Sequence, residues 1–126
     1  MKKTKKVIVA LLAVFSLSGG IIASAGTSYQ SYNVVVGKFN QSTKTSAQTK
    51  TNAGQSANLR VTTLGKALDA RAYAEKGGTG NWVRVSTTGT YNMPNNISAR
   101  DATRMHFSND LTTVVDVAVR GTWRSN

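Results

Sequence analysis

The chain has 126 residues, no cysteine, one histidine and one proline, and its 16 basic and 5 acidic residues give a formal net charge of +11. This length suits a single domain. The lack of cysteine excludes disulfides, thiolate metal sites, iron–sulfur clusters and thiol nucleophiles, and one histidine excludes a multi-histidine metal site, so we expect no metal and no cofactor.

The first 25 residues have the pattern of a helical secretory signal peptide. Four lysines lie among residues 2–6, an apolar run extends over residues 7–22, and Ala23-Ser24-Ala25 forms a small-residue cleavage site. We expect cleavage after Ala25 and release of residues 26–126 as a secreted, extracellular protein. An uncleaved membrane anchor is the alternative, but the run is short for a bilayer span. The composition fits a Gram-positive bacterium.

The expected mature chain is strongly basic. Loss of the four leader lysines leaves twelve basic and five acidic residues, a net charge of +7. A secreted cation of this size meets anionic cell walls and anionic lipid surfaces. Export, together with basic residues that are scattered singly, argues against nucleic acid as a partner. Solubility alone is the competing explanation of the charge.

The first half of the mature chain alternates as β-strands do. Tyr32–Phe39 is β-branched and aromatic, and its even-numbered apolar residues share one face while Val35 and Phe39 share the other. Ser42–Asn52 alternates strictly and is predicted to be a strand with Lys44 and Lys50 on its outer face. A disordered Ser/Thr-rich linker is the alternative for that segment.

A strand and a hairpin are predicted next. Ala57–Leu64 alternates apolar and polar residues. Lys66–Glu75 is predicted to be a strand, because a helix would spread its alternating apolar residues around the circumference, although its alanines keep a helix open as the alternative. The glycine-rich segment 76–81 would then turn the chain into a return strand, Trp82–Ser86.

The last part of the chain contains an irregular stretch and two strands. Residues 87–99 contain several breakers and are predicted to be irregular, with Tyr91 and Met93 packing there. Ala102–Ser108 alternates Met105 and Phe107 with Arg104 and His106, and Thr112–Trp123 gives the strongest strand pattern. About seven short strands predict one antiparallel β-sandwich over residues 26–126, with a small barrel as the alternative. The predicted core comprises Val34, Val36, Leu59, Val61, Leu68, Val83, Val85, Met105, Phe107, Val115, Val117, Val119 and Trp123.

The sequence contains no recognisable catalytic motif. His106 is the only imidazole, and its spacing from Ser108 and the nearby aspartates matches no known arrangement of nucleophile and base. We interpret His106 as a solvent-facing strand residue. The Gly77–Gly80 segment lacks the Lys-Ser/Thr that follows a phosphate-binding loop. We therefore predict no catalytic residues and no enzymatic activity.

Surface character is the remaining functional signal. If the strands pair antiparallel, outward basic and aromatic residues fall on one sheet face and could grip an anionic polymer or lipid head group. Stacking of a sugar on Tyr73 or Trp82 is the carbohydrate variant, and an ordinary solvated face is the alternative. The predicted binding residues are Arg71, Tyr73, Trp82, Arg84 and Arg104.

The overall layout resembles small secreted β-sandwich proteins of Gram-positive bacteria. It combines a signal peptide, a cysteine-free mature chain, a Thr/Ser strand such as Thr43–Thr51 and a closing strand that ends Val119-Arg120-Gly121-Thr122-Trp123. Lactococcin-type sandwich bacteriocins, which interfere with cell-wall synthesis, are among these proteins. The export signal, the net charge of +7 and the lack of a catalytic motif predict a secreted cationic protein that binds an anionic cell-envelope component, and the resemblance implies bacteriocin-like antibacterial activity. The alternative is a structural, adhesion or protein-partner-binding module without antibacterial activity, which would associate through a sheet edge.

Overall fold

The computed structural model of the chain describes residues 24–126, and all of their regular elements are β-strands, which confirms the all-β class. The predicted signal peptide lies outside the described residues except for its last two positions. No helix of the described part is long and apolar enough to span a membrane. The strands are β1 (Ser24–Ala25), β2 (Gln30–Val36), β3 (Ser42–Lys44), β4 (Gln48–Thr49), β5 (Ala57–Leu64), β6 (Leu68–Ala74), β7 (Val83–Val85), β8 (Gly89–Met93), β9 (Ala102–Ser108) and β10 (Val117–Arg124).

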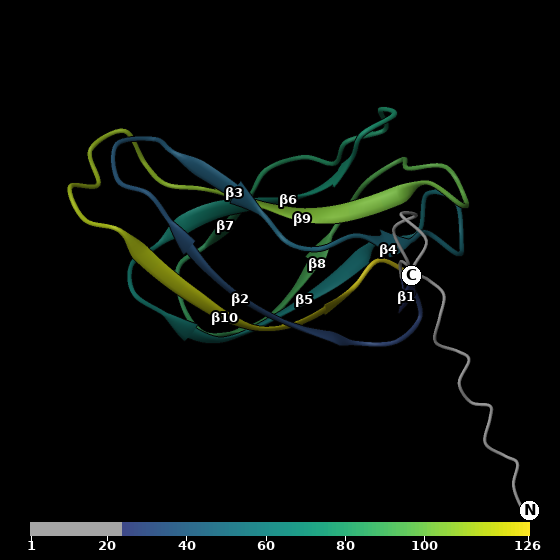
Figure 1. Cartoon of the computed structure of the whole chain (residues 1–126), viewed down its shortest axis with the longest axis horizontal. Coiled ribbons are helices and arrows are strands. Elements are labelled where there is room, and N and C mark those ends of the chain that lie inside the picture. Colours follow the sequence, from purple (N-terminus) through teal and green to yellow (C-terminus); the bar gives the residue numbers. More distant parts are fainter. Residues whose placement is uncertain (1–23) are drawn as a thin grey trace, which may run out of the picture.

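The strands form two sheets that lie one above the other (Figure 1). Sheet A has the order β1-β4-β9-β6-β7, and β3 and β4 pair one after the other along the same edge of β9. Sheet B has the order β2-β10-β5-β8. Every pairing is antiparallel except the short one between β1 and β4. Two separate sheets correspond to the predicted sandwich rather than to the small barrel.

The core fills the space between the two sheets. In β6 the side chains alternate between buried and half-buried, which confirms the strand prediction for this segment and excludes the helix. The predicted core is confirmed except at Val34 and Val83, which are half-buried, and at Val115, which is 48% exposed. The members of the core cluster that are absent from the predicted core are Tyr32, Ala57, Ala70, Ala72, Ala74, Met93 and Ile97.

The segment Ser42–Asn52 is neither one continuous strand nor a disordered linker. It forms β3 and β4, and between them the Thr45 hydroxyl accepts a hydrogen bond from the Met105 amide (3.0 Å). Lys50 was predicted to point outward, but it is 1% exposed. Its ammonium group donates hydrogen bonds to the carbonyl oxygens of Ser125 (2.6 Å) and Gln55, and burial lowers its pKa. These contacts with distant parts of the chain explain why the alternation did not reveal its position.

Two further predictions need correction. Residues 87–99 were predicted to be irregular, yet β8 lies within them and pairs with β5 at the edge of sheet B. The last strand was predicted to begin at Thr112, whereas β10 begins at Val117 because residues 109–116 form a loop. The structure consequently has ten strands instead of about seven.

The two ends of the described chain lie together. The Asn126 amide donates a hydrogen bond to the Gly26 carbonyl (2.8 Å), and β1 lies beside the carboxyl-terminal end in Figure 1. Cleavage after Ala25 would remove β1 and leave β4 paired with β9.

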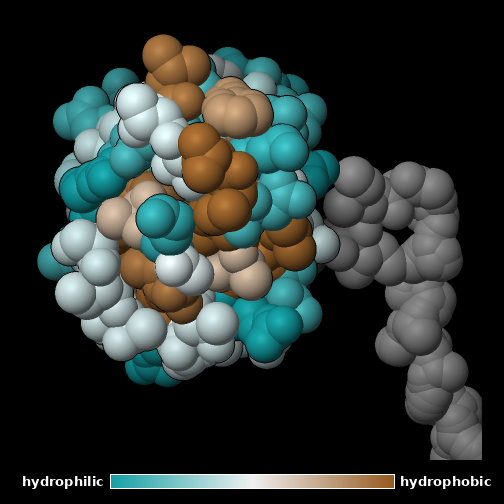
Figure 2. Space-filling model, turned by 90° about the vertical axis from the view of Figure 1, so that its left-hand side faces the viewer, coloured by the Kyte–Doolittle hydropathy of each residue, from teal (hydrophilic) through white to brown (hydrophobic). Residues whose placement is uncertain are grey.

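Loops 37–41 and 109–116 close the opposite end of the sandwich. A backbone hydrogen bond from Phe39 to Thr113 (2.8 Å) helps to tie the two loops together. Figure 2 looks onto this end and shows apolar side chains gathered on it. The exposed large apolar residues of the two loops and of neighbouring β2 are Val35, Phe39, Leu111, Val114 and Val115.

Candidate functional site

The outer face of sheet A brings together the residues predicted to bind. The strand register places His106 on β9 between Lys44 on β3 and Arg71 on β6. The same register pairs Tyr73 with Arg104 and Asp69 with Arg84. The five predicted binding residues all lie on this face: Arg71 and Tyr73 on β6, Trp82 directly before β7, Arg84 on β7 and Arg104 on β9.

His106 lies at the centre of this face and is covered by aromatic rings. The prediction that it faces solvent is wrong, since it is only 8% exposed. The ring centroid of Trp82 lies 5.0 Å from that of His106, and the Tyr73 ring lies 5.5 Å away in an edge-on arrangement. The strand alternation does direct His106 away from the core, but side chains from other strands bury it there.

The surroundings keep the imidazole of His106 uncharged. Burial, followed by the positive charges of Arg71 and Lys44, lowers its pKa from 6.5 to about 4. The Arg71 Nε–H donates a hydrogen bond to His106 Nδ1 (3.1 Å). Because Nδ1 accepts this bond, a neutral ring carries its proton on Nε2. His106 therefore carries a potential hydrogen-bond donor, Nε2–H, at neutral pH.

Two cations of this face lack a carboxylate partner. The Arg71 guanidinium lies 4.3 Å from the centroid of the Trp82 ring, and the Lys44 ammonium lies 4.6 Å from that of Tyr73. Neither residue belongs to any of the ion pairs in the described part of the chain. The aromatic rings thus position two positive charges that remain available to an anion.

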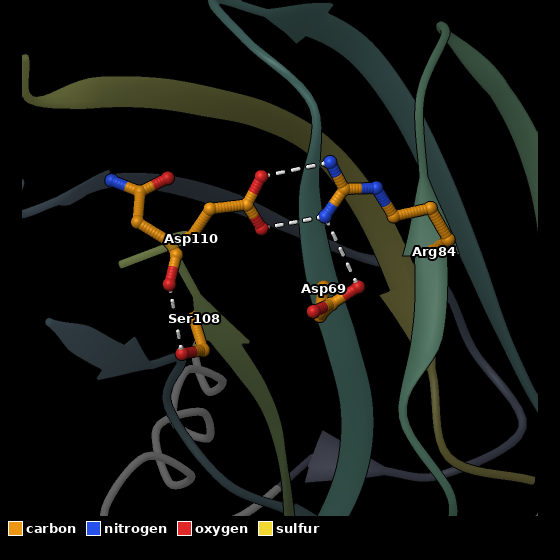
Figure 3. A network of polar contacts seen from close by, with 5 residues as sticks. Asp69, Arg84, Ser108 and Asp110 are labelled. Atoms are coloured by element: carbon orange, nitrogen blue, oxygen red, sulfur yellow. Dashed lines mark hydrogen bonds and ion pairs between the residues drawn. The ribbon is translucent and has the colours of Figure 1, made fainter. Parts of the chain in front are cut away.

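Arg84 and Arg104 differ from these two cations because their charges are compensated. Figure 3 shows the Arg84 guanidinium facing Asp110, with Asp69 beside it. The two bonds to Asp110 measure 2.6 and 2.9 Å, and the contact with Asp69 measures 3.5 Å. Arg104 donates to Glu75 (3.0 Å). The geometry therefore favours Arg71 over Arg84 and Arg104 as an anion-binding residue.

A depression of about 460 Å³ lies beside this cluster, near the loop end of the sandwich. Its lining combines hydroxyl, amide, carboxylate, imidazole and indole groups. The lining residues are Asn40, Ser42, Asp69, Trp82, His106, Ser108, Asn109, Asp110 and Leu111. Among residues 24–126, no group of three or more His, Cys, Asp or Glu side chains is arranged to hold a metal ion.

Ser108 and His106 both line the depression but do not form a nucleophile–base pair. The Ser108 hydroxyl donates to the Asn109 carbonyl oxygen (3.4 Å; Figure 3), and His106 Nδ1 is occupied by Arg71. A nucleophilic serine needs a base within hydrogen-bond reach. The arrangement favours binding over reaction, and the absence of enzymatic activity stays a prediction.

Sequence reasoning missed several residues of the site. Lys44 was placed correctly on an outer face, but only the pairing of β3 with β9 brings it next to His106. Asn109 lies between two predicted strands and was assigned no role, although it is 2% exposed and lines the depression. That His106 is the only histidine of the chain was the one available signal for the centre of the site.

The outer face of sheet B carries a second group of arginines. The guanidinium groups of Arg60 and Arg124 lie 3.6 and 4.6 Å from the centroid of the Tyr29 ring. Arg120 donates to the Asn33 side chain (3.1 Å). No strand of sheet B contains an acidic residue, so this face is also positive.

Comparison with known proteins finds no matching family model, no matching curated protein and no matching solved structure. The chemistry of the site is therefore inferred from its own residues and from no related protein.

Proposed function

We propose that this protein is a secreted cationic β-sandwich that binds an anionic component of the bacterial cell envelope through the outer face of sheet A. The observation that carries the proposal is the pair of uncompensated cations, Lys44 and Arg71, which lie on either side of His106 and against aromatic rings.

Electrostatics supports this assignment. Cations that have no carboxylate partner offer their full charge to a ligand, whereas paired cations must first give up a partner. Arg71 is also held in place by its hydrogen bond to His106 and its contact with Trp82, so little side-chain freedom is lost when an anion binds. A phosphate or carboxylate group on a polymer matches such a site.

The amino-terminal sequence supplies the route to that ligand. A signal peptide cleaved after Ala25 would deliver residues 26–126 to the outside of the cell, where anionic envelope polymers are accessible. Mass spectrometry of the culture medium is expected to find a chain that begins at Gly26. Antibacterial action is the further expectation, and purified protein spotted on lawns of related bacteria would reveal it.

The central experiment measures how much purified protein sediments with isolated Gram-positive cell walls as the salt concentration increases. We expect the bound fraction to fall with salt, because exposed charges are screened. The double variant Lys44→Gln/Arg71→Gln should bind at least about tenfold more weakly, since each lost contact is a charge-assisted hydrogen bond.

The matched control is the double variant Arg60→Gln/Arg120→Gln, which removes the same charge from the outer face of sheet B. Retained binding by this control would assign the ligand to sheet A. Equal losses in both double variants would mean that net charge alone drives binding, and a loss in the control alone would move the site to sheet B. Either of these results contradicts the proposal. Thermal melting of each variant verifies that it is folded.

A further inference from the structure

Two residues that line the depression each contain a buried side-chain atom without a hydrogen-bond partner. The atoms are His106 Nε2 and Asn109 Oδ1, the only such side-chain atoms among the described residues. Their residues are 8% and 2% exposed, and both line the same depression. Buried polar groups are nearly always paired in proteins, so these two atoms need partners from outside the chain.

The contacts of both side chains define what that ligand must supply. Arg71 occupies Nδ1 of His106, so Nε2 carries a hydrogen and needs an acceptor. The Asn109 amide nitrogen donates to the carbonyl oxygens of Val36 and Gly37, both at 2.9 Å. This orients the side chain so that Oδ1 needs a donor. The ligand must accept one hydrogen bond and donate another.

Simple ions meet only half of this requirement. A phosphodiester, a sulfate or an ionised carboxylate accepts but does not donate, and an ammonium group donates but does not accept. Hydroxyl groups do both. The remaining lining agrees, because Ser42, Ser108 and Asp69 add polar groups and Trp82 adds a flat apolar ring. The volume also falls within the range of about 300–1,000 Å³ that small-ligand sites occupy.

From this geometry we infer that the depression binds a hydroxyl-rich sugar unit, with His106 Nε2–H donating to one of its oxygens and Asn109 Oδ1 accepting from one of its hydroxyl or amide hydrogens. The inference rests on the proposed function, of which it names the ligand class: a glycan whose anionic groups face Lys44 and Arg71. Arg84 pairs with both Asp110 and Asp69 on the wall, which reduces the repulsion that the anionic groups of such a glycan would meet there.

Trp82 contacts both His106, which lines the depression, and Arg71, which belongs to the cation pair. Its ring is 43% exposed, covers His106 and carries the Arg71 guanidinium on its face. A sugar that reaches His106 Nε2 must therefore contact or shift the indole. The other tryptophan, Trp123, is 1% exposed in the core, so a ligand-dependent change in fluorescence reports on Trp82.

The test uses the only histidine of the chain as a probe in nuclear magnetic resonance. Purified protein labelled with nitrogen-15 is titrated with cellotetraose, with the N-acetylglucosamine tetrasaccharide and, as an acceptor-only control, with sulfate. We expect at least one oligosaccharide to shift the resonances of His106 Nε2 and of the Asn109 side-chain amide and to change Trp82 fluorescence, with no dependence on salt because both sugars are neutral. Sulfate can accept a hydrogen bond from His106 Nε2 but cannot donate one to Asn109 Oδ1, so it should leave the Asn109 resonance unchanged. No shift of these resonances with either sugar, or an equal shift of the Asn109 resonance with sulfate, overturns the inference.

Variants of the lining hydroxyls provide a second measurement without disturbing His106 or Asn109. Ser42→Ala and Ser108→Ala should each weaken oligosaccharide binding about fivefold, as expected for one hydrogen bond. Ser31→Ala, on the outer face of sheet B, is the matched control and should bind normally. Unchanged binding in both lining variants would contradict the assignment of the sugar to this depression.

The sugar titration and the cell-wall experiment can fail separately. Salt-sensitive wall binding that depends on Lys44 and Arg71, together with no response to either oligosaccharide, would retain the proposed function and remove the sugar site. A response to a neutral oligosaccharide without salt-sensitive wall binding would retain the sugar site and remove the anionic ligand.

Discussion

Protonation of His106 should make the folded protein less stable in mild acid. Burial and the charges of Arg71 and Lys44 lower the pKa of this side chain to about 4 in the folded state, whereas its pKa in the unfolded chain is the ordinary 6.5. The unfolded chain therefore takes up a proton at a higher pH than the folded one. The stabilisation is fully present above pH 6.5 and is lost progressively as the pH falls toward 4.

The size of the effect follows from the difference in pKa. Each unit corresponds to about 1.4 kcal/mol, so the free energy of unfolding should decrease by about 2 kcal/mol between pH 7 and pH 5, and by about 3 kcal/mol at pH 4. Small domains have a total stability of roughly 5–15 kcal/mol, so this loss is easily measured. Urea unfolding at pH 7.5, 6 and 5, followed by the fluorescence of buried Trp123, provides the measurement.

The variant His106→Gln separates this contribution from those of the carboxylates. Arg84 lowers the pKa of Asp110, so the stability that Asp110 contributes is lost only at still lower pH, outside the measured range. The variant should be less stable than the natural protein at pH 7.5, yet its stability should be nearly constant down to pH 5. Parallel pH profiles for the two proteins would refute the reasoning.

Three substitutions test the packing of the fold. Lys50→Met should lower stability by about 1–3 kcal/mol in urea unfolding, because it leaves the buried Ser125 carbonyl without its donor, and an unchanged midpoint would contradict this account. Gly121→Ala should cost about 3 kcal/mol or more in thermal melting, because the added Cβ would collide with the Arg60 carbonyl oxygen at the β-bulge; a cost below 1 kcal/mol would argue against that clash. Trp123→Ala should cost about 3–5 kcal/mol in urea unfolding, and a loss typical of a surface residue would show that the core is packed differently.

The alternation of apolar and polar residues was sufficient to predict the strands that have one face toward the core and the other on the outside of the sandwich. The bounds of β5 and β9 agree with the predicted segments, because apolar side chains recur at every second position: Ala57, Leu59 and Val61 in β5, and Met105 and Phe107 in β9. Lys50 follows the same alternation, but its environment depends on the Ser125 carbonyl, 75 residues away. A pattern within one strand contains no information about such a contact.

For the candidate site, the sequence likewise predicted the face on which residues lie but not their contacts with distant parts of the chain. Alternation in β6, β7 and β9 was enough to place the predicted basic and aromatic residues on one face. It could not show that Arg84 is already neutralised by Asp110, or that Lys44 and Arg71 flank His106, because both depend on the strand register and on a loop. The unpaired atoms of His106 and Asn109 likewise appear only once the neighbouring strands and loops are in place.

Both ends of the described chain lie at one end of the sandwich (Figure 1), and loops 37–41 and 109–116 at the other end contribute residues to the lining of the depression. A linker attached upstream of Ser24 therefore emerges far from the loops at 37–41 and 109–116. A bead or sensor surface coupled through that linker would hold every molecule in the same orientation, with the recognition surface directed outward and unobstructed.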